Sequence, residues 1–187
     1  MSVPVKLGAL PAVVLAHALL ACGGDSMPPD PDAGRADVPG VDSFAPGARV
    51  ELGTGEDAFE PIMDGETLQF IRGPQGGWHF LGSVRVSGLE PGDPDRLDDP
   101  DNPTTEFRVT RDGARVDLMA AVYTQGLRPV SGMGGTFEMV GRLVILDIMR
   151  DEDLDGVTVD MEVTVNAVDG SAGDRRTIRA ERHPLNP

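Results

Sequence analysis

The stretch "VTVDMEVTVNAV", residues 157–168, decides the fold class because apolar and polar residues alternate along it from Val157 to Ala167. Val159, Met161, Val163 and Val165 fall on one face of an extended chain, and polar residues fall on the other. This period of two predicts a β-strand with one buried face and one face in water. Asp169-Gly170 follows directly, and because both residues tolerate positive φ, the pair predicts a hairpin turn.

A partner strand is predicted upstream, over "TFEMVGRLVILDIMR", residues 136–150. Its middle, "LVILDIM", has apolar residues on both faces, so we expect a strand in the centre of the sheet. Gly141 interrupts the pattern and predicts a β-bulge.

The same logic of alternating runs between turn residues predicts further strands, and no stretch has the spacing of an amphipathic helix. These strands are expected at 49–52, 66–72, 78–87, 105–111, 114–124 and 175–182. About eight short strands predict an all-β domain, an antiparallel β-sandwich of immunoglobulin-like type. A small β-barrel is the alternative.

The N-terminus carries a different pattern. Lys6 precedes an apolar run of about 15 residues, which is shorter than the roughly 20 needed to span a membrane. Residues 1–21 therefore predict a signal peptide for secretion.

Leu19-Leu20-Ala21-Cys22, which holds the only cysteine of the chain, resembles the lipobox of bacterial lipoproteins. The resemblance implies cleavage before Cys22, a diacylglyceryl group on its sulfur, and a membrane contact through that lipid anchor. Gly23 follows the cysteine in place of Asp, which in this family implies the outer membrane or the cell surface. An ordinary signal peptide followed by a chance cysteine is the alternative.

Composition separates two further regions. Residues 22–46 are rich in Pro, Gly and Asp and predict a disordered acidic tether, whereas 47–187 form the predicted β-sandwich domain. A net charge of −15 argues against nucleic-acid binding, which requires clustered Lys and Arg. A lone cysteine excludes a disulfide within the chain, so we expect the domain to be held by its core alone.

The segment "DEDLDGVTVDME", residues 151–162, matches the spacing of an EF-hand calcium loop. A strand, not a helix, is predicted to follow, and it carries Glu162 roughly 16 Å beyond Val157 and away from the ion. What remains is a turn with Asp151, Asp153 and Asp155, which resembles the DxDxDG loops of some extracellular β proteins. It predicts a calcium site, with a solvated acidic turn as the alternative.

No catalytic motif such as GxSxG, HExxH or CxxC occurs. In the strand 78–87, Trp78 is expected to face the core and His79 to face outward. We expect a lipid-anchored cell-envelope protein with a binding or structural role toward an envelope partner, and not an enzyme. The alternatives are an envelope protein that binds calcium or another metal, and an envelope enzyme built around His79.

Overall fold

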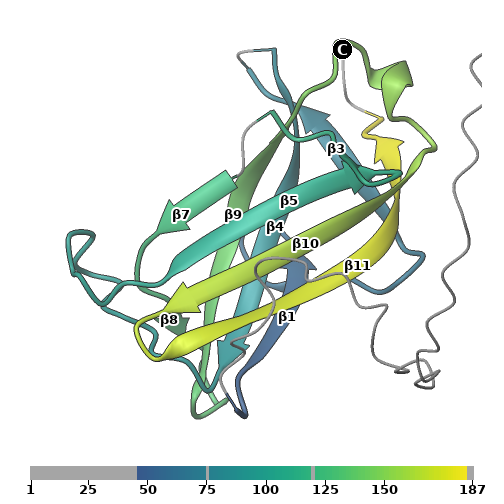
Figure 1. Ribbon diagram of the computed structural model, residues 1–187. Helices are drawn as coiled ribbons and strands as arrows, with labels where there is room; N and C mark the ends of the chain where they lie inside the picture. Colours follow the sequence, from purple (N-terminus) through teal and green to yellow (C-terminus); the bar gives the residue numbers. More distant parts are fainter. Residues whose placement is uncertain (1–45, 75, 119–120, 185–187) are drawn as a thin grey trace, which may run out of the picture. The chain divides into compact units, whose positions relative to one another are not determined.

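The computed structural model describes residues 46–184, apart from residue 75 and residues 119–120 (Figure 1). The predicted signal peptide, Cys22 and nearly all of the predicted tether lie outside the described residues. Within the described part, regular structure consists of strands and one short 3₁₀-helix, η1, and no segment is a helix able to cross a membrane. In chain order the elements are β1 (Arg49–Thr54), β2 (Glu60–Pro61), β3 (Thr67–Arg72), β4 (Trp78–Ser87), β5 (Thr104–Arg111), β6 (Ala114–Arg115), β7 (Ala121–Thr124), β8 (Arg128–Pro129), β9 (Thr136–Leu146), η1 (Asp151–Asp153), β10 (Thr158–Ala167) and β11 (Gly170–Arg182).

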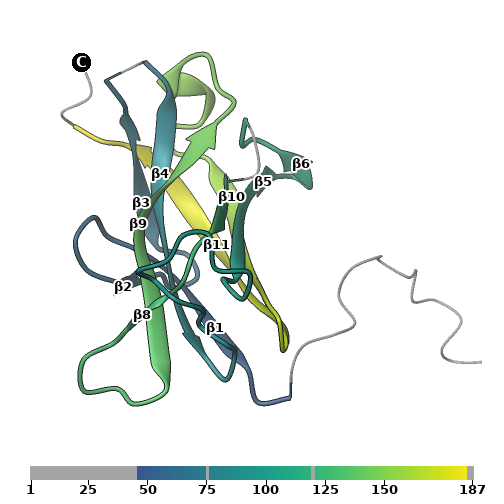
Figure 2. The same cartoon turned by 90° about the vertical axis from the view of Figure 1, so that its left-hand side faces the viewer.

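The strands form two packed layers (Figure 2). In the first, the β4 sheet, β9 pairs with one edge of β4, while β1 and β3 share its other edge. In the second, the β10 sheet, β10 lies between β11 and β5, and β5 also pairs with β6 and β7. The strand β3 joins the two layers, because it leaves β4 and pairs with β11 over Thr67–Phe70.

The two layers are also linked at the margin opposite β3. Leu118 N–H donates to the Ile145 carbonyl at 3.0 Å, and Asp147 N–H donates to the Val116 carbonyl at 2.7 Å. The all-β sandwich prediction is therefore confirmed, with links between the layers at both margins. The pairing of β3 with β11 is parallel, whereas the other pairings between the named strands are antiparallel.

The core fills the space between the two sheets, as the alternation in the sequence predicts. Val159, Met161, Val163 and Val165 of β10 are all buried, and the residues between them are exposed or partly exposed. Across from them lie the inward side chains of β4, where Phe80 and Trp78 each meet the Phe70 ring edge-on. Each such aromatic pair contributes about 0.5–1.5 kcal/mol beyond its buried area.

The predicted bulge at Gly141 is confirmed. The register between β4 and β9 shifts between Gly82 and Val84, and Gly141 has a φ of 69°, which favours glycine. Its N–H donates to the hydroxyl of the fully buried Ser83 at 3.0 Å. A Cβ at Gly141 would lie 2.6 Å from the Glu56 carbonyl oxygen, so the bulge also requires close backbone approach.

The outermost strands of the β4 sheet, β2 and β8, are two residues long and each contains a proline, Pro61 and Pro129. Proline cannot donate a hydrogen bond to a further strand.

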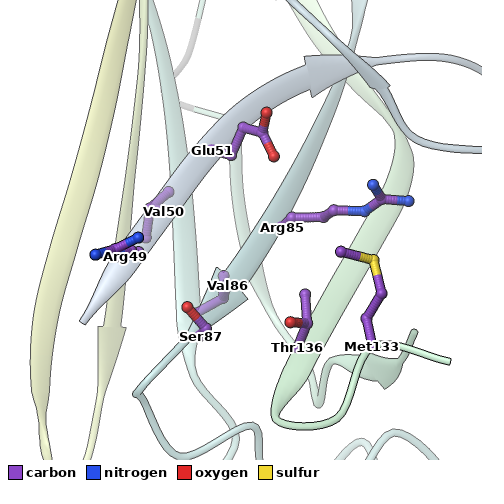
Figure 3. A pocket seen from close by; sticks show the side chains of 8 residues that line it. All are labelled: Arg49, Val50, Glu51, Arg85, Val86, Ser87, Met133 and Thr136. Atoms are coloured by element: carbon purple, nitrogen blue, oxygen red, sulfur yellow. The ribbon is translucent and has the colours of Figure 1, made fainter. Parts of the chain in front are cut away.

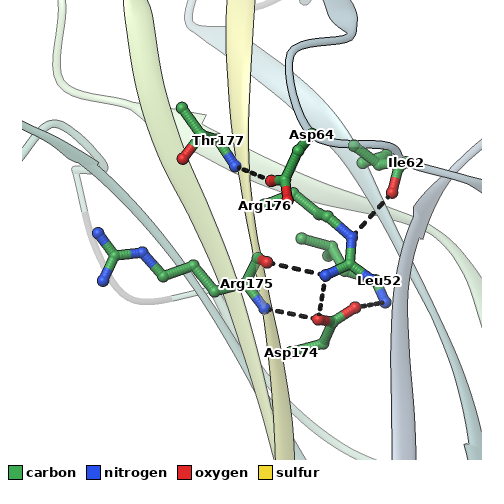
Figure 4. Close-up of polar contacts among 7 residues, drawn as sticks. All are labelled: Leu52, Ile62, Asp64, Asp174, Arg175, Arg176 and Thr177. Atoms are coloured by element: carbon green, nitrogen blue, oxygen red, sulfur yellow. Dashed lines mark hydrogen bonds and ion pairs between the residues drawn. The ribbon is translucent and has the colours of Figure 1, made fainter.

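A polar cluster joins β11 to β1 at the seam between the layers (Figure 4). Asp174 and Arg176 occupy inward positions of β11, and their side chains are bonded at 2.6 Å. The Asp174 carboxylate accepts the N–H of the fully buried Leu52 at 2.9 Å, and Arg176 Nε donates to the Ile62 carbonyl at 3.0 Å. The carboxylate thus takes the place of a strand partner for β1, since a buried N–H without an acceptor is costly.

Candidate binding surface

The three aspartates of the predicted calcium turn lie on and beside η1, and each is bonded to an arginine. The Asp151 carboxylate is 2.7 Å from a guanidinium nitrogen of Arg182, and Asp155 accepts the Arg182 N–H at 2.8 Å. Asp153 instead pairs with Arg150 at 3.1 Å. The hydrogen bond from Arg182 holds the pKa of Asp151 below its ordinary value. Asp151 and Asp155 therefore meet around Arg182, while Asp153 is engaged on the other side of the turn.

Glu162 lies on β10, where its side chain is exposed, as the sequence predicts. Among the described residues, no group of three or more His, Cys, Asp or Glu side chains is arranged to hold a metal ion. Calcium binding at the turn stays a prediction, and it would require the ion to displace Arg182 and Arg150.

A second candidate surface lies on the β4 sheet. On the outer face of the β4 sheet, the strand register places Ile71 of β3 beside His79 of β4, and His79 beside Ile145 of β9. Leu118 completes this row, because its N–H bonds to the Ile145 carbonyl. Side chains of directly opposed residues lie on the same face of a sheet, so the row runs across four segments of the chain.

A second row runs parallel to the first, with Leu81 of β4 opposite Leu143 of β9. Leu143 and Ile145 are 46% and 42% exposed, and Leu118 is 57% exposed. We call these two rows the apolar face; it consists of Ile71, His79, Leu81, Leu118, Leu143 and Ile145. As the sequence predicts, β9 has a strand on each side, β4 and β8, but the outer side chains Leu143 and Ile145 are not covered by any described part of the chain.

The β3–β4 hairpin and part of the apolar face together line a pocket. The pocket has a volume of about 530 Å³ and is lined by Gly73, Pro74, Gly77, Trp78, His79, Leu143 and Ile145. Gly73 N–H donates to the Gly77 carbonyl at 2.8 Å, which fixes the hairpin above the sheet. Burial of the ring lowers the pKa of His79. We call this the His79 pocket.

Toward the other end of β4, the outer face of the β4 sheet is charged and no longer apolar. There Glu51, Arg85, Glu138 and Arg128 follow one another across β1, β4, β9 and β8, so the charges alternate in sign. Arg85 is 3.0 Å from Glu138, and its guanidinium lies 4.4 Å from the centre of the Phe59 ring.

A second pocket of about 380 Å³ adjoins this charged row (Figure 3). It is lined by Arg49, Val50, Glu51, Arg85, Val86, Ser87, Met133 and Thr136. Charged and hydroxyl-bearing side chains dominate it, in contrast to the His79 pocket.

The outer face of the β10 sheet is polar. Asp160 accepts the Thr177 hydroxyl and pairs with Arg175, both at 2.6 Å, and Arg108 pairs with Glu106 at 2.7 Å. The Thr177 hydroxyl, followed by Arg175, holds the pKa of Asp160 below its ordinary value. A polar face is well solvated by water and does not require a binding partner. The apolar face exposes apolar side chains to water, so it is the surface on which binding of a partner is favoured.

The sequence contains a signal for the apolar face, namely the run of apolar residues around Leu143 and Ile145, but that run is interpreted from the sequence as a central strand and not as a binding surface. The pocket beside it could not be predicted, because it depends on the pairing of three strands.

No family model matches the chain, and the searches of curated proteins and of solved structures give no match either.

Proposed function

We propose that the chain is a lipid-anchored cell-envelope protein whose β domain has a binding role and presents the apolar face to a partner. The lipid anchor rests on Leu19-Leu20-Ala21-Cys22 and its resemblance to a lipobox. The binding role rests on one observation, the exposed Leu143 and Ile145 in a strand whose pattern is typical of cover on both faces.

The arrangement of the domain supports this role. The described chain enters beside β1, and Arg49 pairs with Ser87 at the end of β4. The His79 pocket lies where β4 begins, and ten residues of strand span about 30 Å. An anchor at Cys22 would therefore attach at one end of the sandwich and leave the pocket at the other end.

The apolar face is a better candidate for the binding surface than the edge strands of the β4 sheet. Binding by strand addition requires a free edge with available N–H groups. The β4 sheet ends in β2 and β8, whose prolines remove one donor each.

Metabolic labelling with radioactive palmitate tests the anchor. The chain should carry label, and Cys22→Ser should remove the label and release the protein from the membrane fraction. The matched control is Ser26→Cys in the Cys22→Ser chain, which keeps one cysteine but moves it away from Ala21. This control should stay unlabelled; equal labelling of all three forms, or none of any, would contradict the anchor.

A further inference from the structure

The His79 pocket has the size and lining of a small-molecule site. Ligand pockets in proteins typically measure about 300–1,000 Å³, are mostly apolar, and contain a few fixed polar groups. This pocket measures about 530 Å³, and among the described residues that line it His79 is the one with an ionisable side chain. Leu143 and Ile145 of the apolar face and the edge of Trp78 contribute apolar side chains to the lining.

The polar group of the lining is the His79 imidazole. A neutral imidazole has one N–H donor, and its other nitrogen is a hydrogen-bond acceptor. The ring is partly buried, which favours the uncharged form.

The lining also restricts the charge of a ligand. The described residues of the lining contribute neither a carboxylate nor a guanidinium group, so a charged ligand would lose hydration without gaining an opposite charge from them. An uncharged ligand has no such penalty, and a donor group on it can meet the acceptor nitrogen of His79.

We propose that the His79 pocket binds a small, uncharged, largely apolar molecule that carries one N–H or O–H donor. The site deepens the proposed binding role and depends on it only for its cellular setting. A second copy of the chain is the competing occupant, although two copies each carry a net charge of −15.

The test uses N-phenyl-1-naphthylamine, a neutral apolar probe with one N–H and strong fluorescence in apolar surroundings. Trp78 is the only tryptophan of the chain and lines the pocket, so energy transfer from Trp78 reports a probe bound near it, and the site variants locate that probe. The purified Cys22→Ser chain, which should lack the lipid and therefore need no detergent, should show saturable transfer at one probe per chain. The sulfonated analogue 8-anilinonaphthalene-1-sulfonate should bind at least about tenfold more weakly, because its charge meets no partner in the pocket.

Two variants locate the site. Ile145→Lys places a charge in the pocket and should abolish transfer, whereas Val168→Lys, at another exposed apolar residue outside the pocket, should leave it unchanged. His79→Phe keeps the apolar volume and removes the acceptor, so the probe should bind about three- to tenfold more weakly, as expected for one neutral hydrogen bond. N-methylation of the probe should weaken its binding to the parent chain but not to His79→Phe.

Absence of saturable transfer would overturn the proposal, as would equal transfer in Ile145→Lys. Sedimentation tests the competing occupant, a second copy of the chain. A stable dimer that Ile145→Lys dissociates would overturn the ligand site and assign the apolar face to contact between copies. Trp78 emission reports on the pocket and palmitate labelling reports on Cys22, so each proposal can fail independently of the other.

Discussion

Replacing Asp174 by alanine should destabilise the domain more than any change to a surface ion pair. The carboxylate accepts the N–H of Leu52, which is distant in sequence, and pairs with Arg176. Asp174→Ala removes both interactions and leaves the Leu52 N–H, on a fully buried residue, without that acceptor.

The size of the effect follows from burial. A buried donor that loses its acceptor costs about 1–3 kcal/mol. The Asp174 and Arg176 side chains are 13% and 28% exposed, so the loss of their ion pair adds about 1 kcal/mol after allowance for solvent screening. The free energy of unfolding should therefore fall by about 2–4 kcal/mol.

Urea unfolding measures this change through the fluorescence of Trp78, which is buried in the native fold. With a slope of about 2 kcal/mol per molar urea, the midpoint should fall by about 1–2 M. The matched control is Asp160→Ala on the outer face of β10. It breaks an ion pair with Arg175, whose side chain is 61% exposed, and the hydrogen bond from the Thr177 hydroxyl. Because water can replace both interactions on this exposed face, the change should cost about 1 kcal/mol or less.

Equal midpoints for the two variants would refute the assignment of Asp174 as the acceptor that completes β1. A further check is Arg176→Met in the Asp174→Ala chain. Because the pair is already broken, the second change should add less than it does in the parent chain.

Other predictions concern the bulge, the imidazole and the acidic turn. Gly141→Ala should cost about 2–4 kcal/mol in urea unfolding, because a Cβ there meets the Glu56 carbonyl at 2.6 Å in addition to the strain of positive φ. Gly132→Ala, with positive φ but open space, should cost only about 1 kcal/mol, and similar costs would argue against the steric contact. Burial places the folded pKa of His79 below its ordinary value of 6.5, so its contribution to stability is complete above pH 6.5 and is lost as pH falls through the folded pKa. His79→Gln should flatten that part of the stability profile, and an unaltered profile would contradict the burial of the ring. If the acidic turn binds calcium, millimolar Ca²⁺ should raise the Tm and Asp151→Asn should abolish the rise; an unchanged Tm would remove the site.

Local patterns explain why much of the fold could be predicted. The alternation of β10 and β4 sets which side chains face the core, and a glycine in an apolar strand indicates where a bulge is tolerated. The predicted strand at 114–124 was too long: the described residues there form β6, a bridge at Asp117 and β7. The strand predicted at 175–182 was too short, because Gly170–Asp174 has no apolar alternation.

The remaining features depend on contacts between distant segments. The inward Asp174 looks like an ordinary turn residue in the sequence, and only the N–H of Leu52 explains its position. Likewise the parallel pairing of β3 with β11 follows from no local signal. The apolar character of Leu143 and Ile145 could be read from the sequence, but its exposure could not, because exposure depends on what packs outside the strand.

The two-residue strands β2 and β8 have a consequence for molecules held at high density on one surface. Chains crowded in this way collide repeatedly in similar orientations. A long edge strand with unpaired N–H and C=O groups would then allow neighbouring chains to pair and aggregate. Pro61 and Pro129 lie in the two outermost strands of the β4 sheet, and because each lacks the N–H that a neighbouring chain would need, pairing between chains at these two edges is disfavoured.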